Sequence, residues 1–165
     1  MKLGFIGAGN MARAIINGWS SQGQKAEIYL HSAHKASYEP YAKEHGLHAC
    51  TSNTEVVSKA DIIFLAVKPL VLAEVLHEIK ETVQAKKPVV VSMVTGVSIA
   101  EIADLLELTP KELEVIRIMP NVNAEIAAGM TALNASPAVT ETNFLRVKGL
   151  FEMIGQTEIL PEKDF

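Results

Sequence analysis

The sequence is poor in the features that mark several classes of protein. Its 165 residues include one cysteine, Cys50, so no disulfide can form within the chain, as in most proteins of a reducing compartment. The net charge is −4, and Lys and Arg form no basic block, which argues against a nucleic-acid partner. No apolar run is long enough to cross a bilayer, and the first residues do not resemble a signal peptide. We therefore expect a cytoplasmic protein with neither a nucleic-acid nor a membrane partner.

Clusters of residues that carry metal or catalytic chemistry are scarce as well. There is no C-x-x-C pair, and His45 and His48 lie on either side of an expected break between a helix and a strand. No Ser/His/Asp spacing and no paired carboxylates at strand ends are visible in the sequence. We predict no metal site and assign no catalytic residue, and we interpret Cys50 as a small buried hydrophobe.

A glycine-rich motif stands at the start of the chain. Leu3 to Ile6 form an apolar run typical of a buried parallel strand, and Gly7-Ala8-Gly9-Asn10-Met11-Ala12 follows at once. This is the G-x-G-x-x-A form of the dinucleotide fingerprint. Gly7 permits a sharp turn, Gly9 lets a pyrophosphate approach the backbone, and Ala12 lets the next helix pack closely on the sheet. The free N–H groups of that helix would then face the phosphates, although a glycine turn without a ligand is the alternative interpretation.

The end of the second expected strand bears on the choice of cofactor. After residues 27–30 the chain reads His31-Ser32-Ala33-His34-Lys35, where an NAD-specific site usually has Asp or Glu for the ribose. Hydroxyl and cationic groups favour a 2′-phosphate, so we predict NADPH as the cofactor, with NADH possible. Ser32 and Lys35 are the main candidates, and His34 would contribute more at lower pH. A solvated turn that binds nothing is the alternative.

Strand and helix patterns alternate along almost the whole chain. We expect strands at 3–6, 27–30, 47–50, 61–67, 88–93, 115–119, 129–134 and 156–160, and helices at 9–22, 38–45, 70–83, 99–106 and 140–153, with another helix after Thr51 to Glu55. That segment offers several candidates for the helix cap, so spacing alone leaves the role of Asn53 open, and a cap is the favoured interpretation. This alternation predicts an α/β fold with a Rossmann-like, doubly wound, mostly parallel sheet and helices on both faces, in one domain over residues 1–160. Lys68-Pro69, at the end of strand 61–67, would lie at the ligand edge of that sheet.

Five stretches occur together in an order and spacing that point to one family. They are Gly4 to Ala12, Phe64 to Pro69, Gly96 to Ile99, Met119 to Asn121 and Gly129 to Ala132. In these stretches the chain resembles the N-terminal domain of the pyrroline-5-carboxylate reductase family. The resemblance implies the cofactor-binding portion of an enzyme that reduces the small molecule 1-pyrroline-5-carboxylate to L-proline with NAD(P)H, the last step of proline biosynthesis.

The resemblance also implies which residues contact the cofactor. The pyrophosphate would lie against Ile6, Gly7, Ala8, Gly9, Asn10 and Met11. Ser32 would lie by the adenosine ribose or its phosphate, and Asn53 would contact the adenosine half, which gives it a role beyond that of a cap. The cofactor groove would be lined by Ala66, Val67, Lys68 and Pro69, and the nicotinamide end by Thr95, Gly96 and Asn121.

The chain departs from the family pattern in two ways. Leu70 stands where the family often has Gln, and Val122-Asn123 replace the Thr-Pro that usually follows Met-Pro-Asn beside the nicotinamide. Family members also continue into a helical dimerisation domain that carries the substrate site, and residues 161–165 resemble its start. The resemblance therefore implies a fragment that binds cofactor without turnover, and a homo-oligomer only with the missing domain.

Two other functions fit the same fingerprint. F420-dependent NADP reductases and β-hydroxyacid dehydrogenases share the fingerprint and the fold, but the latter need a catalytic Lys on a later helix. A dinucleotide-sensing or partner-binding module without catalysis is the second alternative. The Lys68-Pro69 and Met119-Pro120-Asn121 signatures favour the reductase of the resemblance.

Overall fold

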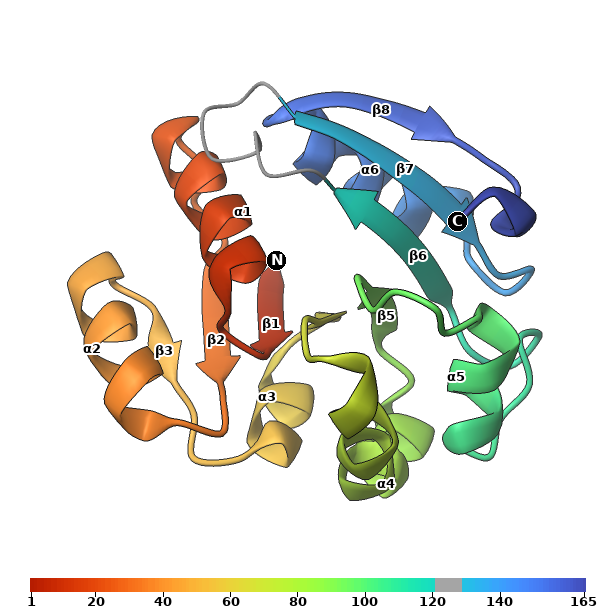
Figure 1. The fold of residues 1–165 in the computed structure, drawn as a ribbon, viewed down its shortest axis with the longest axis horizontal. Helices are drawn as coiled ribbons and strands as arrows, with labels where there is room; N and C mark the ends of the chain where they lie inside the picture. The colour runs from red at the N-terminus through yellow and green to blue at the C-terminus, as the bar shows by residue number, and fades with distance from the viewer. Residues whose placement is uncertain (121–128) are drawn as a thin grey trace.

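The computed structural model describes residues 1–120 and 129–165, and over these ranges the chain forms one eight-stranded sheet flanked by helices (Figure 1). The strands are β1 (Lys2–Ile6), β2 (Glu27–His31), β3 (His48–Ala49), β4 (Ile62–Leu65), β5 (Val89–Ser92), β6 (Val115–Pro120), β7 (Gly129–Ala135) and β8 (Gly155–Ile159). The helices are α1 (Asn10–Ser21), α2 (Lys35–His45), α3 (Asn53–Lys59), α4 (Pro69–Lys86), α5 (Ile99–Leu105), α6 (Glu141–Glu152) and the short 3₁₀ helix η2 (Glu162–Asp164).

The order of the strands defines the architecture. They pair in the order β3-β2-β1-β4-β5-β6-β7-β8, with β1 to β6 parallel, β7 antiparallel to β6, and β8 parallel to β7. The order 3-2-1-4-5-6 is that of the doubly wound dinucleotide-binding fold, in which the winding direction reverses between β1 and β4. The predicted fold class is confirmed, including the mostly parallel sheet.

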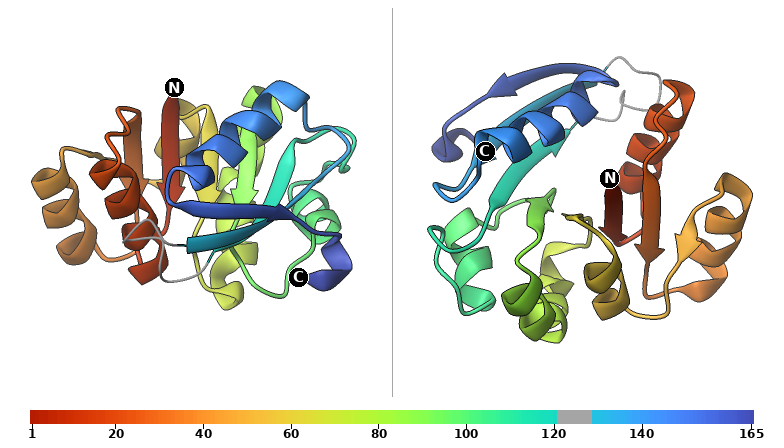
Figure 2. Two further views of the ribbon diagram at one scale, coloured as in Figure 1. Left: turned by 90° about the horizontal axis from the view of Figure 1, so that it is seen from above. Right: turned by 180° about the vertical axis from the view of Figure 1, so that it is seen from behind.

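Helices cover both faces of the sheet because successive strand residues point to opposite sides. Leu3 and Phe5 of β1 belong to a core cluster shared with α1, α2 and α6, whereas Ile6 belongs to a second cluster shared with α3, α4 and α5. Two further views of the ribbon show the same two layers of helices (Figure 2). Strands β4 and β5 are buried along their whole length, as expected for parallel strands covered on both faces.

Trp19 of α1 forms the aromatic centre of the first cluster. Its ring lies 5.8, 5.5 and 5.8 Å, between centroids, from the rings of Phe5, Phe64 and Phe151. The indole N–H donates to the Leu150 carbonyl at 2.7 Å, so this buried polar group is satisfied. The interpretation of Trp19 as a core residue is confirmed.

Two local predictions were wrong. Helix α2 begins at Lys35 and not at residue 38, so Lys35 lies in the first turn of a helix and not in a loop. Asn53 does not cap α3, because the Ser52 hydroxyl accepts the Glu55 N–H at 3.0 Å and fills that role. The side chain of Asn53 is thereby released for the contacts described below.

The single cysteine is buried, as predicted. Cys50 is 4% exposed, and burial together with the nearby Glu55 carboxylate raises the pKa of its thiol to about 11. A thiol in that state is almost entirely protonated at neutral pH and is a poor nucleophile. Cys50 therefore contributes packing to the second core cluster.

Ionic and aromatic contacts hold the last residues against the sheet. Arg117 of β6 is buried and pairs with Glu162 at 3.1 Å, while its guanidinium lies 5.0 Å from the centroid of the Phe165 ring. Glu162 also accepts the Ile99 N–H at 2.6 Å, at the start of α5. The segment around η2 thus packs on β6 and α5 as part of the same structure.

Candidate functional site

The fingerprint loop joins β1 to α1 at the carboxyl end of the sheet. Gly7 has a φ of +105°, and a Cβ built there would lie 2.2 Å from the Ala66 carbonyl oxygen, so only glycine fits without strain. The Gly7 N–H donates to the His31 carbonyl at 2.8 Å, and the Ala66 N–H donates to the Ile6 carbonyl at 2.8 Å. These bonds fix the turn between the ends of β2 and β4. The sharp turn predicted at Gly7 is present.

Gly9, two residues later, faces open space. It is exposed, and a Cβ built there would meet no heavy atom within 4 Å. As the residue preceding α1 it supplies no side-chain cap, and the first turn of α1 contains no acidic residue. The first N–H groups and the positive end of the helix dipole therefore meet no competing carboxylate from this turn. Buried Ala12 lets α1 lie close to the sheet, and the resulting cradle suits a diphosphate.

Other residues proposed to bind the cofactor follow the ends of neighbouring parallel strands. Residues 66–69 follow β4; the first two are half-buried and the last two are exposed, with Pro69 opening α4. Thr95 and Gly96 are exposed in the loop after β5, and Gly96 has a φ of +77°. Because these strands are parallel, their loops share one edge with the fingerprint. Asn121 lies outside the described residues.

The segment after β2 leads into the first turn of α2. Ser32 is half-buried, and residues 34–35 are exposed. Arg13 of α1, which we did not single out from the sequence, donates through Nε to the Ala8 carbonyl (2.8 Å) and through its guanidinium to the Ser37 hydroxyl (2.8 Å). Arg13 thereby ties the fingerprint loop to the start of α2. A long cationic side chain one turn into the fingerprint helix is the signal that could have found it.

Asn53 links two elements at the same edge of the sheet. Its side chain is 8% exposed, its Oδ1 lies 2.6 Å from Nδ1 of His31 at the end of β2, and its Nδ2 donates to Glu78 of α4 at 3.1 Å. The sequence shows no carboxylate at the end of β2, yet the fold brings Glu78 within hydrogen-bonding distance of Asn53, which the resemblance assigns to the adenosine half. No local signal reveals this contact, because Glu78 lies 25 residues from Asn53 and meets it only where α3 packs on α4.

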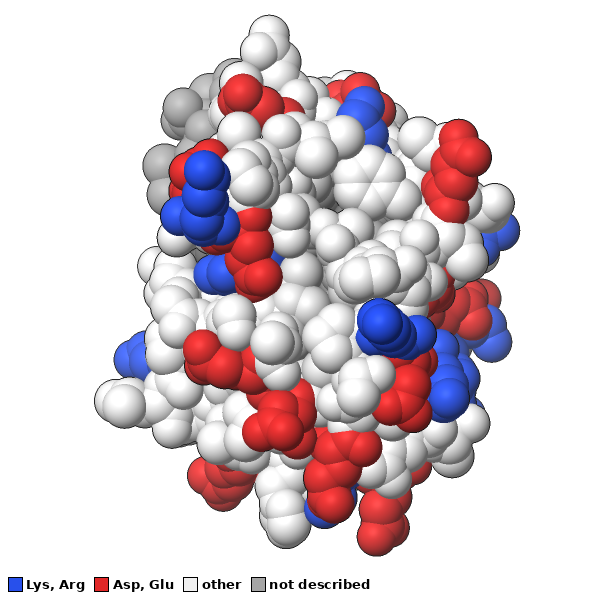
Figure 3. Space-filling view, turned by 90° about the vertical axis from the view of Figure 1, so that its right-hand side faces the viewer, with Lys and Arg blue, Asp and Glu red and all other residues white. Residues whose placement is uncertain are grey.

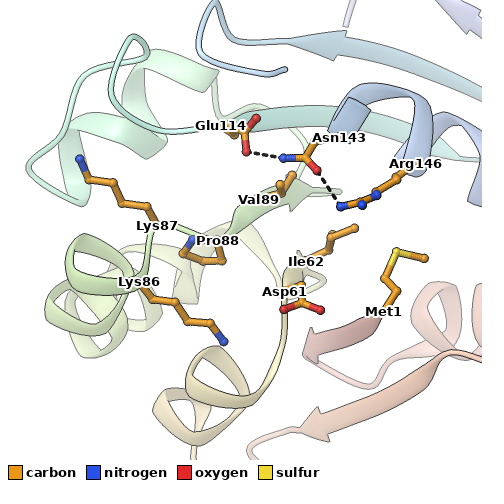
Figure 4. Close-up of a pocket in the computed structure, with 10 residues that line it drawn as sticks. All are labelled: Met1, Asp61, Ile62, Lys86, Lys87, Pro88, Val89, Glu114, Asn143 and Arg146. Atoms are coloured by element: carbon orange, nitrogen blue, oxygen red, sulfur yellow. Dashed lines mark hydrogen bonds between the residues drawn. The ribbon is translucent and has the colours of Figure 1, made fainter. Parts of the chain in front are cut away.

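A hollow of about 600 Å³ lies at the opposite, amino end of the sheet (Figure 4). Several of its charged residues form hydrogen bonds within the protein. The Lys86 ammonium donates to the carbonyls of Val57, Ser58 and Ala60, and burial lowers the pKa of Lys86. Glu114 accepts from the Asn143 amide at 2.7 Å. This hollow shares no residue with the fingerprint edge, and its hydrogen bonds join α3 to α4 and the residue preceding β6 to α6.

Two properties are relevant to nucleic-acid and membrane partners: the distribution of surface charge and the apolar character of the helices. On the face of the molecule shown in Figure 3, basic and acidic side chains are intermixed and do not gather into one basic field. Among the described residues, no helix combines the length and apolar character needed to cross a membrane.

Comparisons with known proteins agree with this geometry. The chain is 36% identical over 163 residues to the pyrroline-5-carboxylate reductase of Escherichia coli, an alignment that covers 98% of this chain and 59% of the relative. The 1-pyrroline-5-carboxylate reductase of Streptococcus pyogenes superposes with a TM-score of 0.87 at 30% identity, covering 100% of this chain and 60% of that one. The Plasmodium falciparum enzyme with NADP bound gives 0.84 at 27% identity, covering 99% and 59%.

A family model identifies the first part of the chain. The model described as NADP oxidoreductase, coenzyme F420-dependent, matches residues 2–96, which include the fingerprint, Asn53 and the Lys68-Pro69 pair. The match covers more than half of the chain, so the protein belongs to this family. The chain spans about three fifths of the length of the reductases it resembles.

Proposed function

We propose that this member of the NADP oxidoreductase family is the cofactor-binding portion of a pyrroline-5-carboxylate reductase, and that it binds NADPH and also admits NADH. The observation that carries the proposal is the Gly7–Gly9 cradle at the carboxyl end of the sheet. It occurs in a chain that is 36% identical to the Escherichia coli reductase over almost its whole length. The names of these relatives favour this reductase over an F420-dependent activity.

We propose a role for each group of residues from its chemistry and its place at the carboxyl end of the sheet. The backbone N–H groups at the start of α1 would hold the diphosphate, and Gly9 would allow its approach. Ser32, His34 and Lys35 would meet the adenosine ribose or its 2′-phosphate, with Asn53 beside them. Residues 66–69, Thr95, Gly96 and Asn121 would orient the nicotinamide half. The bound nicotinamide would supply the hydride for reduction of the substrate's C=N bond.

The proposal extends to the whole protein's substrate, assembly and place in the cell. The substrate would be 1-pyrroline-5-carboxylate, and the product L-proline. We assign no catalytic residue to this chain, and we place substrate binding and homo-oligomer formation in a helical domain that would start at residues 161–165. The intermixed surface charge supports a protein without a nucleic-acid partner, and we propose a cytoplasmic location.

Paired thermal-shift titrations with NADPH and NADH, run beside a proline-forming assay, test the proposal. A ligand that binds only the folded state stabilises it by about 2.7 kcal/mol at 100 times its Kd. We expect a shift with both cofactors, at lower concentration with NADPH, and no turnover. The absence of a shift with either cofactor would refute cofactor binding. Turnover by these 165 residues would show that the substrate site is present.

A further inference from the structure

The side chain of Asn53 has both ends of its amide engaged by residues from other elements. His31 is the last residue of β2, Asn53 is the first of α3, and Glu78 lies within α4. The His31 Nδ1 and Asn53 Oδ1 atoms are 2.6 Å apart, and Asn53 Nδ2 is 3.1 Å from Glu78 Oε2. Because Asn53 is 8% exposed, its amide cannot exchange these partners freely for water.

The hydrogen-bonding capacity of each group determines which atom donates and which accepts in the series from Glu78 through Asn53 to His31. An ionised carboxylate only accepts, so Glu78 must face the amino group of the Asn53 amide. The amide oxygen must then face His31, which requires the hydrogen of the neutral imidazole to be on Nδ1. The lone pair of that ring is consequently left on Nε2. A charge on α4 thus selects the tautomer of a histidine at the carboxyl end of β2.

We infer that Glu78 is a positioning residue for the adenosine end of the cofactor, and that it limits the preference for NADPH over NADH. The inference rests on the proposed function. A His31 lone pair on Nε2, and the Glu78 carboxylate that is linked to His31 through Asn53, suit ribose hydroxyls, which can donate hydrogen bonds. A 2′-phosphate needs donors and is repelled by the Glu78 charge. Glu78 therefore reduces the preference for NADPH that Ser32 and Lys35 would create.

The replacement Glu78→Gln tests this inference because it removes the charge and keeps the size of the side chain. A glutamine amide can either donate or accept, so the single amide orientation of Asn53 is lost. We expect ¹⁵N NMR of the imidazoles to show the Nδ1–H tautomer of His31 in the parent chain and a mixture of tautomers in the variant. We also expect the ratio of the NADH Kd to the NADPH Kd to rise about three- to tenfold, the scale of a partly solvated like-charge interaction.

Glu74→Gln provides the matched control, since Glu74 is exposed one turn earlier on α4 and undergoes the same change of charge. It should alter neither the His31 tautomer nor the Kd ratio. An unchanged tautomer and ratio in Glu78→Gln, or equal effects in the two variants, would overturn the inference. If the parent chain bound neither cofactor, the proposed function would fail, and the tautomer measurement would still test the Glu78–Asn53–His31 chain by itself.

Discussion

The hollow at the amino end of the sheet and the fingerprint loop at its carboxyl end differ in whether their polar groups have partners within the protein. At the amino end, the Lys86 ammonium is held by three backbone carbonyls and Glu114 is held by Asn143. At the carboxyl end, a Cβ added to Gly9 would meet no heavy atom within 4 Å, and α1 begins without a side-chain cap. Groups that satisfy one another stabilise the fold, whereas backbone donors without internal partners are available to a ligand. We propose that the polar groups of the amino end contribute stability and that the backbone donors of the carboxyl end bind the cofactor.

The largest expected effect is at Gly7, which belongs to the proposed binding loop and also fixes the fold of that loop. Gly7→Ala would place a Cβ 2.2 Å from the Ala66 carbonyl oxygen at a φ of +105°. Because the neighbour is backbone, the strain cannot be relieved by a side-chain rotation. We expect a loss of about 3 kcal/mol or more in the free energy of unfolding, measured by urea denaturation. A loss below about 0.5 kcal/mol would mean that the turn can rearrange.

Gly9→Ala should separate binding from stability. Gly9 has an ordinary φ of −77° and open space around it, so we expect the free energy of unfolding to change by less than about 0.5 kcal/mol. The added methyl group would occupy the approach of the diphosphate, and the NADPH Kd should rise at least about tenfold, which corresponds to 1.4 kcal/mol. Calorimetric titration measures the Kd. Unchanged affinity would place the diphosphate elsewhere.

Lys86→Met should lower stability and leave cofactor binding unchanged, the reverse of the result expected for Gly9→Ala. It removes the ammonium that caps the carbonyls of Val57, Ser58 and Ala60 at the end of α3. We expect a loss of about 1 kcal/mol in the free energy of unfolding and no change in the NADPH Kd. Lys87→Met, one residue along and exposed, is the control and should change neither quantity. If NADPH bound more weakly to Lys86→Met and not to Lys87→Met, the two ends of the sheet would be energetically coupled, which would contradict their separate roles.

The smallest expected effect is at Lys35, which lies exposed in the first turn of α2. Lys35→Gln should weaken NADPH binding about threefold, because solvent and salt screen an exposed charge. NADH, which lacks the 2′-phosphate, should bind as before. Titrations of both cofactors at low and high salt measure this difference. Equal weakening of both cofactors would show that Lys35 does not act on the 2′-phosphate.

Much of the fold could be predicted because its signals are local. The apolar run that became β4 and the glycines of the fingerprint each carry their structural reason within a few residues. The first turn of α2 is hard to predict because its polar residues resemble a loop. The cap of α3 is equally hard to predict, because several residues beside Asn53 could serve and Ser52 does. The contact of Asn53 with Glu78, and that of Arg13 with Ser37, depend on packing between helices distant in sequence. No pattern in the sequence identifies the partners in these two contacts.

The central claim is that the carboxyl end of this sheet binds a nicotinamide dinucleotide. The most direct measurement is a ¹H–¹⁵N NMR titration of the chain with NADPH, following every backbone amide. We predict the largest shifts at Gly7, Gly9 and Asn10, with further shifts at Ser32 and Lys35, and almost none around the hollow at Lys86 and Asn143. Shifts gathered around that hollow, or none at the fingerprint, would contradict the claim.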